Sequence, residues 1–216
     1  MGNRIFTSSG HLIESGGKVI LRGLLFFTLF TIFTGRATAD QSINFLYHPS
    51  GFGKGGSGDL YLSQNIQPIA GRPSVLWIIG KIKNGSGEKT GNIVSARPPV
   101  DTIMEAFSKE FKAAGYNVIP VEIMPEGVQK GIKLTIVSIR LEKIDKIYKV
   151  ESKCVVKVSL EPWLNGTPLK RLDYESFQED STFINRDMIL LKSEQEALQQ
   201  LIAKAVREAI ALLERK

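Results

Sequence analysis

Alternating apolar and polar residues in the second half of the chain predict a three-stranded antiparallel meander. From Cys154 to Leu160 every second residue is apolar, which is typical of a strand with one face on a core and one in water. Between Ile132 and Leu141 the phase of the apolar residues changes near Ile136, which indicates either a bulge or two covered faces. Asn165-Gly166 is a strong hairpin signal, and it leads into a third strand that ends at Gln178.

Apolar residues at helical spacing predict two helices. Over residues 100–114 the stripe contains Ile103, Phe107 and Phe111, and Gly115 is placed to end the helix. Residues 186–213 predict a longer helix with one apolar face. Ser193 with Glu196 resembles a capping box, so the regular part of that helix is expected to begin there. In this interpretation Glu194, Gln195, Lys204, Arg207 and Glu208 lie on its solvent side.

Shorter apolar runs predict further strands, and one of them at a sheet edge. These runs are 42–48, 60–67, 75–82, 93–94 and 116–122. Pro120 interrupts the last run and cannot donate a ladder hydrogen bond, so we expect that strand at an edge. Gly51 to Gly58 is too rich in glycine for regular structure, and we expect a mobile loop or linker there.

Together these elements predict an α+β fold. We expect a two-layer sandwich, in which a mainly antiparallel sheet carries both helices on one face. The chain then divides into a signal peptide (1–39), an N-terminal segment with the Gly-rich loop (40–59) and a single α+β domain (60–216).

Residues 1–39 have the pattern of a cleaved signal peptide. Arg22 precedes an uncharged, mostly apolar run from Gly23 to Phe33, and Ala37-Thr38-Ala39 is a small-x-small site. A membrane span needs roughly 20 apolar residues, and this run is shorter. We therefore expect cleavage after Ala39, a periplasmic product and no stable membrane span in the mature form. The alternative is an uncleaved signal that anchors the protein in the inner membrane, because Arg36 lies close to the cut.

Charge and cysteine content exclude several classes of partner. The formal net charge is +6, but four of the basic residues lie before the proposed cut, so the remainder is nearly balanced and nucleic acid is not expected as a partner. The single cysteine, Cys154, excludes a disulfide within the chain. The first residue after the cut is Asp40, so no cysteine is placed to carry a lipoprotein anchor. The oligomeric state stays open.

Candidate chemistry is sparse, and we expect no enzyme, no cofactor and no metal site. Cys154 falls on the apolar face of its strand, where a thiol behaves as a small hydrophobe. His48, the one histidine after the cut, lies in a loop region. Residues 51–56 match G-x-G-x-x-G, but a strand-like run follows them where the dinucleotide fingerprint needs a helix.

Four residues are candidates for contact with a partner. Trp163, just before the Asn-Gly turn, is a candidate exposed aromatic. Lys149, Lys153 and Lys157 belong to a basic run that could meet anionic lipid headgroups or glycans. The alternative is that these lysines pair across the meander with the acidic residues of the third strand, which include Glu175 and Glu179.

The layout resembles that of the YajG-like family of small bacterial envelope lipoproteins. The segments that carry the resemblance are Val75–Ile82, the pattern DTIMEAFSKEFKAAGYNVI from Asp101 to Ile119, and the run Lys204–Ala209 after the meander. The resemblance implies a sheet with two helices on one face and a role as an envelope assembly or accessory protein. This chain departs from the family in lacking the lipobox cysteine and in having the Gly51–Gly58 loop.

From these observations we expect a non-enzymatic, exported accessory protein that binds another envelope component, either a protein or a lipid or glycan. The alternative is a module that binds a lipid or other amphiphile in a pocket between helices and sheet. A continuous apolar pocket that opens to solvent would favour the alternative.

Overall fold

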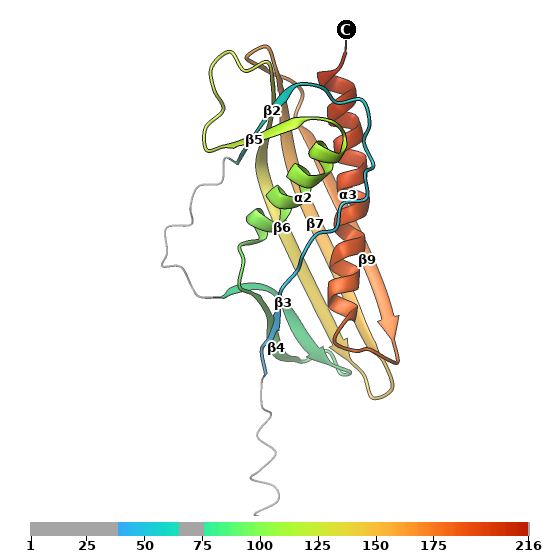
Figure 1. Ribbon diagram of the computed structural model, residues 1–216. Coiled ribbons are helices and arrows are strands. Elements are labelled where there is room, and N and C mark those ends of the chain that lie inside the picture. The colour runs from blue at the N-terminus through green and yellow to red at the C-terminus, as the bar shows by residue number, and fades with distance from the viewer. Residues whose placement is uncertain (1–38, 65–75, 216) are drawn as a thin grey trace, which may run out of the picture. The chain divides into compact units, whose positions relative to one another are not determined.

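The computed structural model describes residues 39–64 and 76–215, which belong to one compact unit (Figure 1). The predicted signal peptide up to Thr38 and the end of the predicted strand 60–67 lie outside the described residues. The strands are β1 (Gln41–Ile43), β2 (Asp59–Gln64), β3 (Trp77–Asn84), β4 (Lys89–Ser95), β5 (Asn117–Val121), β6 (Lys130–Asp145), β7 (Val150–Leu164), β8 (Thr167–Pro168) and β9 (Leu172–Thr182). The helices are α2 (Pro99–Ala113) and α3 (Ile189–Leu213).

The long strand β6 is the centre of the sheet. Along one edge it pairs with β7, which pairs in turn with β9, so the predicted antiparallel meander is confirmed. Its other edge is divided between two parallel partners. Residues Gly131–Leu134 pair with β2, and residues Leu141–Asp145 pair with β3. Beyond these, β5 continues from β2, and β4 and then β1 continue from β3.

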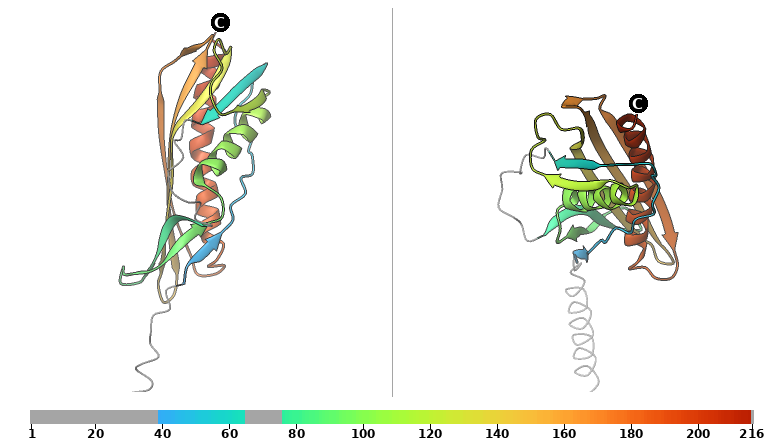
Figure 2. Two further views of the ribbon diagram at one scale, coloured as in Figure 1. Left: turned by 90° about the vertical axis from the view of Figure 1, so that its left-hand side faces the viewer. Right: turned by 45° about the horizontal axis from the view of Figure 1, so that its top comes forward.

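The expected α+β class is therefore correct, but the expectation of a mainly antiparallel sheet in a plain two-layer sandwich is wrong. The fold is α+β, but four of the strand pairings are parallel and the sheet is strongly curled (Figure 2). The reason is the divided edge of β6. Strands β2 and β5 extend the sheet from the first part of β6, whereas β3, β4 and β1 extend it from the last part. Because neighbouring strands are twisted relative to one another, the two groups do not lie in one plane. Strand β5 lies at one end of the strand order, as Pro120 predicted.

A bulge in β6 accounts for the phase change seen in the sequence. The register between β6 and β7 shifts between Leu134 and Ile136, and the Thr135 hydroxyl donates to the Ser159 carbonyl at 3.3 Å. The bulge lies between the residues that pair with β2 and those that pair with β3. It thus separates the two parts of the divided edge.

Both helices lie on the same side of the sheet (Figure 2). Helix α3 packs on β7 and β9, and α2 packs against α3, β5 and β6. The α2 stripe of Ile103, Phe107 and Phe111 is fully buried. Gly115 follows α2 with φ of 111°, a conformation that suits glycine at a helix end.

The predicted start of the last helix is wrong, and its solvent face is predicted correctly for Lys204, Arg207 and Glu208 but not for Glu194. The helix begins at Ile189, so Ser193 is inside it, and its hydroxyl donates to Asp180 Oδ2 at 2.8 Å. Glu194, expected in solvent, is 2% exposed. The side of α3 that contacts the sheet is wider than the stripe of aliphatic residues, and it includes both polar side chains.

The N-terminal segment, residues 44–58, lies almost entirely outside the helices and strands, as the glycine content of Gly51–Gly58 predicted, but it packs across the two helices and is not a free linker. The buried Glu110 carboxylate of α2 accepts hydrogen bonds from the Tyr47 hydroxyl and from the amides of Ser50, Gly51 and Phe52. Gly53 is buried where a Cβ atom would lie 2.6 Å from Ile210 Cδ1. Glycine at this position therefore allows the segment to pack closely on α3.

Candidate functional site

A group of exposed apolar side chains at one end of the sheet is the candidate functional site. The group consists of Ile147, Tyr148, Phe183, Ile184 and Met188, each between 60 and 85% exposed. These residues are half of the ten exposed large hydrophobic residues found among residues 39–64 and 76–215. They come from only two loops, the β6–β7 turn (146–149) and the β9–α3 loop (183–188). We call this group the apolar end; it lies at the lower end of Figure 1.

The β6–β7 turn places two large apolar residues where polar residues are usual. The Lys146 amide donates to the Lys149 carbonyl at 2.9 Å, which makes Ile147 and Tyr148 the central residues of a tight turn. Asn, Asp and Gly dominate such positions because they suit the backbone of the turn. The turn itself thus gives no reason for an isoleucine and a tyrosine at its exposed tip.

The β9–α3 loop holds its apolar residues outward through local hydrogen bonds. The Ile184 amide donates to Thr182 Oγ1 at 3.2 Å, and the Met188 amide donates to the Asn185 carbonyl at 3.0 Å. Asn185 has φ of 56°, a left-handed conformation that asparagine tolerates. Arg186 Nη2 donates to the Ile147 carbonyl at 3.3 Å, so the two loops are joined directly.

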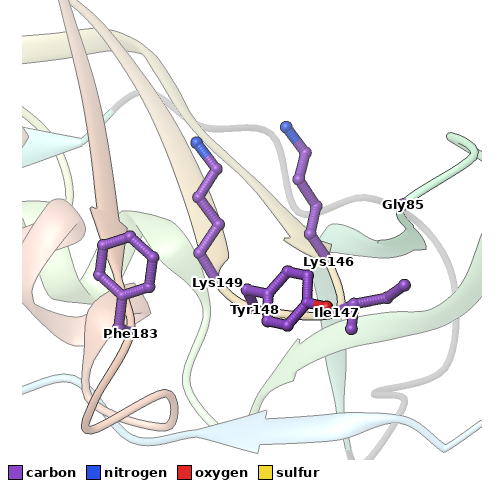
Figure 3. Close-up of a pocket in the computed structure, with 6 residues that line it drawn as sticks. All are labelled: Gly85, Lys146, Ile147, Tyr148, Lys149 and Phe183. Atoms are coloured by element: carbon purple, nitrogen blue, oxygen red, sulfur yellow. The ribbon is translucent and has the colours of Figure 1, made fainter.

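A hollow of about 570 Å³ lies between these loops and the β3–β4 turn. Its lining residues are Gly85, Lys146, Ile147, Tyr148, Lys149 and Phe183 (Figure 3). In the close-up the Lys146 and Lys149 side chains extend in the same direction, and the Tyr148 and Phe183 rings lie below their ends. The surface therefore combines apolar side chains with a basic margin.

The two lysines of the turn share one carboxylate. Lys146 Nζ and Lys149 Nζ both lie 2.7 Å from Glu151 Oε1. Their hydrogen bonds lower the pKa of Glu151 to about 2, so this carboxylate stays ionised at all physiological pH values. Two positive charges face one negative charge, and the turn keeps a net positive charge.

The structure separates the predicted contact lysines. Lys149 lies at the margin of the apolar end. Lys153 and Lys157 lie on the helix-free face of the sheet, where they pair with Glu179 at 3.1 Å and Glu175 at 2.9 Å on β9. The predicted cross-strand pairing is confirmed for these two lysines.

Trp163 lies at the other end of β7 from Lys149. The intervening strand spans about 45 Å at roughly 3.3 Å per residue. Trp163 is half-buried, and its indole Nε1 donates to Glu161 Oε1 at 2.7 Å. The four predicted contact residues therefore do not form one site.

The side chains considered for catalysis are not assembled either. Cys154 is fully buried, and burial together with the Glu194 carboxylate raises the pKa of its thiol, so the prediction of a core cysteine is confirmed. His48 is exposed on the N-terminal segment, and its carbonyl accepts from Gln195 Nε2 at 3.3 Å. No group of three or more His, Cys, Asp or Glu side chains suited to a metal ion occurs in the described part of the chain.

The apolar end itself was missed in the sequence, although a signal for it was present. Ile147-Tyr148 stands between two lysines at the point where one strand must turn into the next. A bulky apolar pair in a turn is a stronger sign of a contact surface than any residue within the strands.

Within the described residues, no helix has both the length and the apolar character needed to cross a membrane.

Comparisons with known proteins give distant structural similarity and no family. No family model matches the chain, and no curated protein matches it. A crystal structure from Xanthomonas campestris, assigned to the family DUF330, shares 12% identity and a TM-score of 0.48, over 80% of this chain and 95% of the other. A homologue of the neuraminyllactose-binding hemagglutinin from Helicobacter pylori shares 11% identity and a TM-score of 0.44, over 80% and 97%.

Rare lipoprotein B from Shewanella oneidensis shares 12% identity and a TM-score of 0.34, over 63% of this chain and 98% of the other. These scores are too low to bear on the function of this chain, and the resemblance to the YajG-like family stays a prediction.

Proposed function

We propose that the protein is a non-enzymatic accessory protein of the bacterial cell envelope, and that it binds another envelope component through the apolar end. The observation that carries the proposal is the exposure of Ile147, Tyr148, Phe183, Ile184 and Met188 on two joined loops. Contiguous exposed apolar groups on soluble proteins commonly mark interaction sites. The signal-peptide pattern of residues 1–39 supports an envelope location.

The packing inside the fold supports contact at this end more than ligand binding between helices and sheet. Leu198 and Ile202 of α3 and Val156 and Val158 of β7 are at most 1% exposed and belong to one core cluster. The alternative of an amphiphile held between these elements stays a prediction.

Site-specific photo-cross-linking in living cells tests the proposal. A photoreactive amino acid is placed at Tyr148, at Phe183 and, as a control, at Ile123. Ile123 is 81% exposed and precedes β6, so it lies at the opposite end of that strand from the β6–β7 turn. We expect adducts from positions 148 and 183 that are absent from position 123.

Equal cross-linking from all three positions, or none, would contradict binding through the apolar end. The non-enzymatic part of the proposal has a separate test. Hydrolase activity of the purified protein that disappears when one carboxylate is replaced would overturn it.

A further inference from the structure

We propose that the partner of the apolar end is a lipid bilayer surface that contains anionic phospholipid. In this proposal Ile147, Tyr148, Phe183 and Ile184 insert into the interfacial layer of the bilayer. The inference rests on the proposed binding role and names the class of component that is bound.

The course of the chain provides the first argument. Strand β1 runs parallel to β4, with Gln41 beside Ile93, so the chain before β1 points back toward the β3–β4 turn. Ala39 lies against Gly91, where an added Cβ atom would be 2.4 Å from the Ala39 carbonyl oxygen. Gly91 pairs with Ile82, and Ile82 pairs with Lys143, three residues before the β6–β7 turn.

The chain that precedes Ala39 therefore joins the domain at the end of the sheet where the apolar end lies. That preceding chain contains Arg22 and the apolar run Gly23–Phe33, which is a membrane-directed sequence in either reading of residues 1–39. If the signal is uncleaved, the sequence of the membrane anchor precedes the point where the chain enters this end of the sheet. If it is cleaved after Ala39, the mature chain begins at this end of the sheet.

The chemistry of the side chains provides the second argument. Aliphatic and aromatic side chains with lysines beside them are typical of surfaces that lie in the membrane interface. Tyr148 has an apolar ring with a polar hydroxyl, and long lysine side chains can place their charges at headgroup level. Lys146 and Lys149 share the single carboxylate of Glu151, so positive charge remains to attract anionic headgroups.

The geometry provides the third argument, because the two loops present their apolar residues together. Arg186 of one loop bonds the carbonyl of Ile147 in the other, and Phe183 and Ile147 line the same hollow. Two loops joined in this way can enter an interface as one unit. No hydrogen bond of the core has to break for this insertion.

Vesicle co-flotation tests the inference. The chain from Asp40 to Lys216, which contains all the strands and helices described above, is mixed with vesicles of phosphatidylcholine, with or without phosphatidylglycerol. We expect flotation with the vesicles that contain phosphatidylglycerol and weaker flotation at high salt, because exposed charges are screened. The variant Ile147→Ser with Phe183→Ser should partition at least about tenfold more weakly, since each insertion removes a large apolar side chain from water.

Two control variants make the result specific. Ile123→Ser removes an exposed isoleucine at the opposite end of β6 and should float like the parent chain. Lys149→Gln should weaken binding only to vesicles that contain phosphatidylglycerol. Ile123, Ile147 and Phe183 are exposed, and Lys149 is half-buried at the surface, where Lys146 also pairs with Glu151. Unfolding midpoints in urea should therefore stay close to that of the parent and confirm that each variant is folded.

The outcomes separate this inference from the proposed function. Absence of flotation, or flotation that the loop variants leave unchanged, overturns the membrane inference. If a protein is cross-linked from Tyr148 while vesicles are not bound, the proposed function stands and the partner is a protein. If neither is observed, both proposals fail.

Discussion

Glu194 is a carboxyl group buried without a partner, in contact with the sheet. Its Oε2 atom has no hydrogen-bond partner, and burial raises the pKa of the carboxyl group to about 8. The nearby Cys154 thiol, whose pKa is also raised, is uncharged and offers no compensation. Glu194 is therefore protonated in the folded protein near neutral pH.

This protonation predicts a loss of stability as pH rises. The unfolded chain releases the Glu194 proton near its ordinary pKa of 4.5, whereas the folded chain keeps it up to about 8. Between these values the folded state binds more protons, so the free energy of unfolding falls with increasing pH, by an amount on the order of 5 kcal/mol. Above the pKa of Glu194 in the folded protein, its titration lowers the free energy of unfolding no further.

The variant Glu194→Gln should remove this contribution while keeping the shape of the side chain. Urea unfolding of parent and variant at about pH 5 and about pH 8 measures it. We expect the variant to gain stability relative to the parent between the two pH values. Ionised carboxylates such as Asp180, whose lowered pKa has the opposite effect, are common to both chains and cancel in the difference. A difference that does not depend on pH would contradict the prediction.

At the scale of the element, the divided edge of β6 depends on a close approach by β3. Gly80 pairs with Leu141, and a Cβ atom added at Gly80 would lie 2.2 Å from the Leu141 carbonyl oxygen. That contact is with backbone, so no side-chain rotation can relieve it. The parallel pairing between β3 and β6 thus requires glycine at this position.

The variant Gly80→Ala should lower the free energy of unfolding by about 1–3 kcal/mol, the usual range for overpacking. The matched control is Gly85→Ala in the turn that follows β3, where the nearest atom would be 3.7 Å away and φ is not positive. We expect the control to be neutral or slightly stabilising. Amide exchange should increase over Leu141–Asp145 only in Gly80→Ala, and equal effects of the two changes would refute the argument.

Local signals in the sequence predicted the elements, whereas the connections among them depended on distant residues. The Asn165-Gly166 turn, the end of α2 before Gly115 and the edge position of β5 follow from backbone preferences of single residues. The parallel pairings of β6 join segments far apart in the chain, and the sequence of neither strand indicates which strand it pairs with. The curl of the sheet therefore had no local signal.

The buried polar residues of the helices had a signal that aliphatic patterns hide. Glu194 lies four residues after Leu190, three before Ala197 and seven before Leu201, so it falls within the apolar stripe of α3. Glu110 is likewise three residues after Phe107 in α2. A charged residue at a position within an apolar stripe indicates a side chain that is buried and has a specific role. The group with which it interacts cannot be predicted from the sequence of the helix alone. Of the four predicted contact residues only Lys149 lies at the candidate site, because the charge pattern indicates the lysines and not the apolar turn beside them.

At the scale of the whole molecule, the N-terminal segment connects the apolar end to the other end of β6. It follows β1, which starts near the β3–β4 turn, and leads into β2, which pairs with Gly131–Leu134 at the start of β6. On the way it crosses α2 and α3 and buries Phe45 and Tyr47. The segment therefore holds the point where the chain enters the domain in a fixed position.

Glu110 is the main polar attachment of this segment, and its replacement tests that role. The variant Glu110→Ala leaves the Tyr47 hydroxyl and three backbone amides without their acceptor, so we expect a loss of about 2–4 kcal/mol in the free energy of unfolding. Amide exchange should increase most over residues 50–58. The relative protection of amides in the meander strands β6 and β7 should be the same as in the parent chain. Lys112→Ala, an exposed change on the same helix, is the control and should alter neither quantity. If exchange in residues 50–58 stays the same in Glu110→Ala, the segment is held by its other contacts, and the carboxylate does not fix the entry of the chain at this end of the sheet.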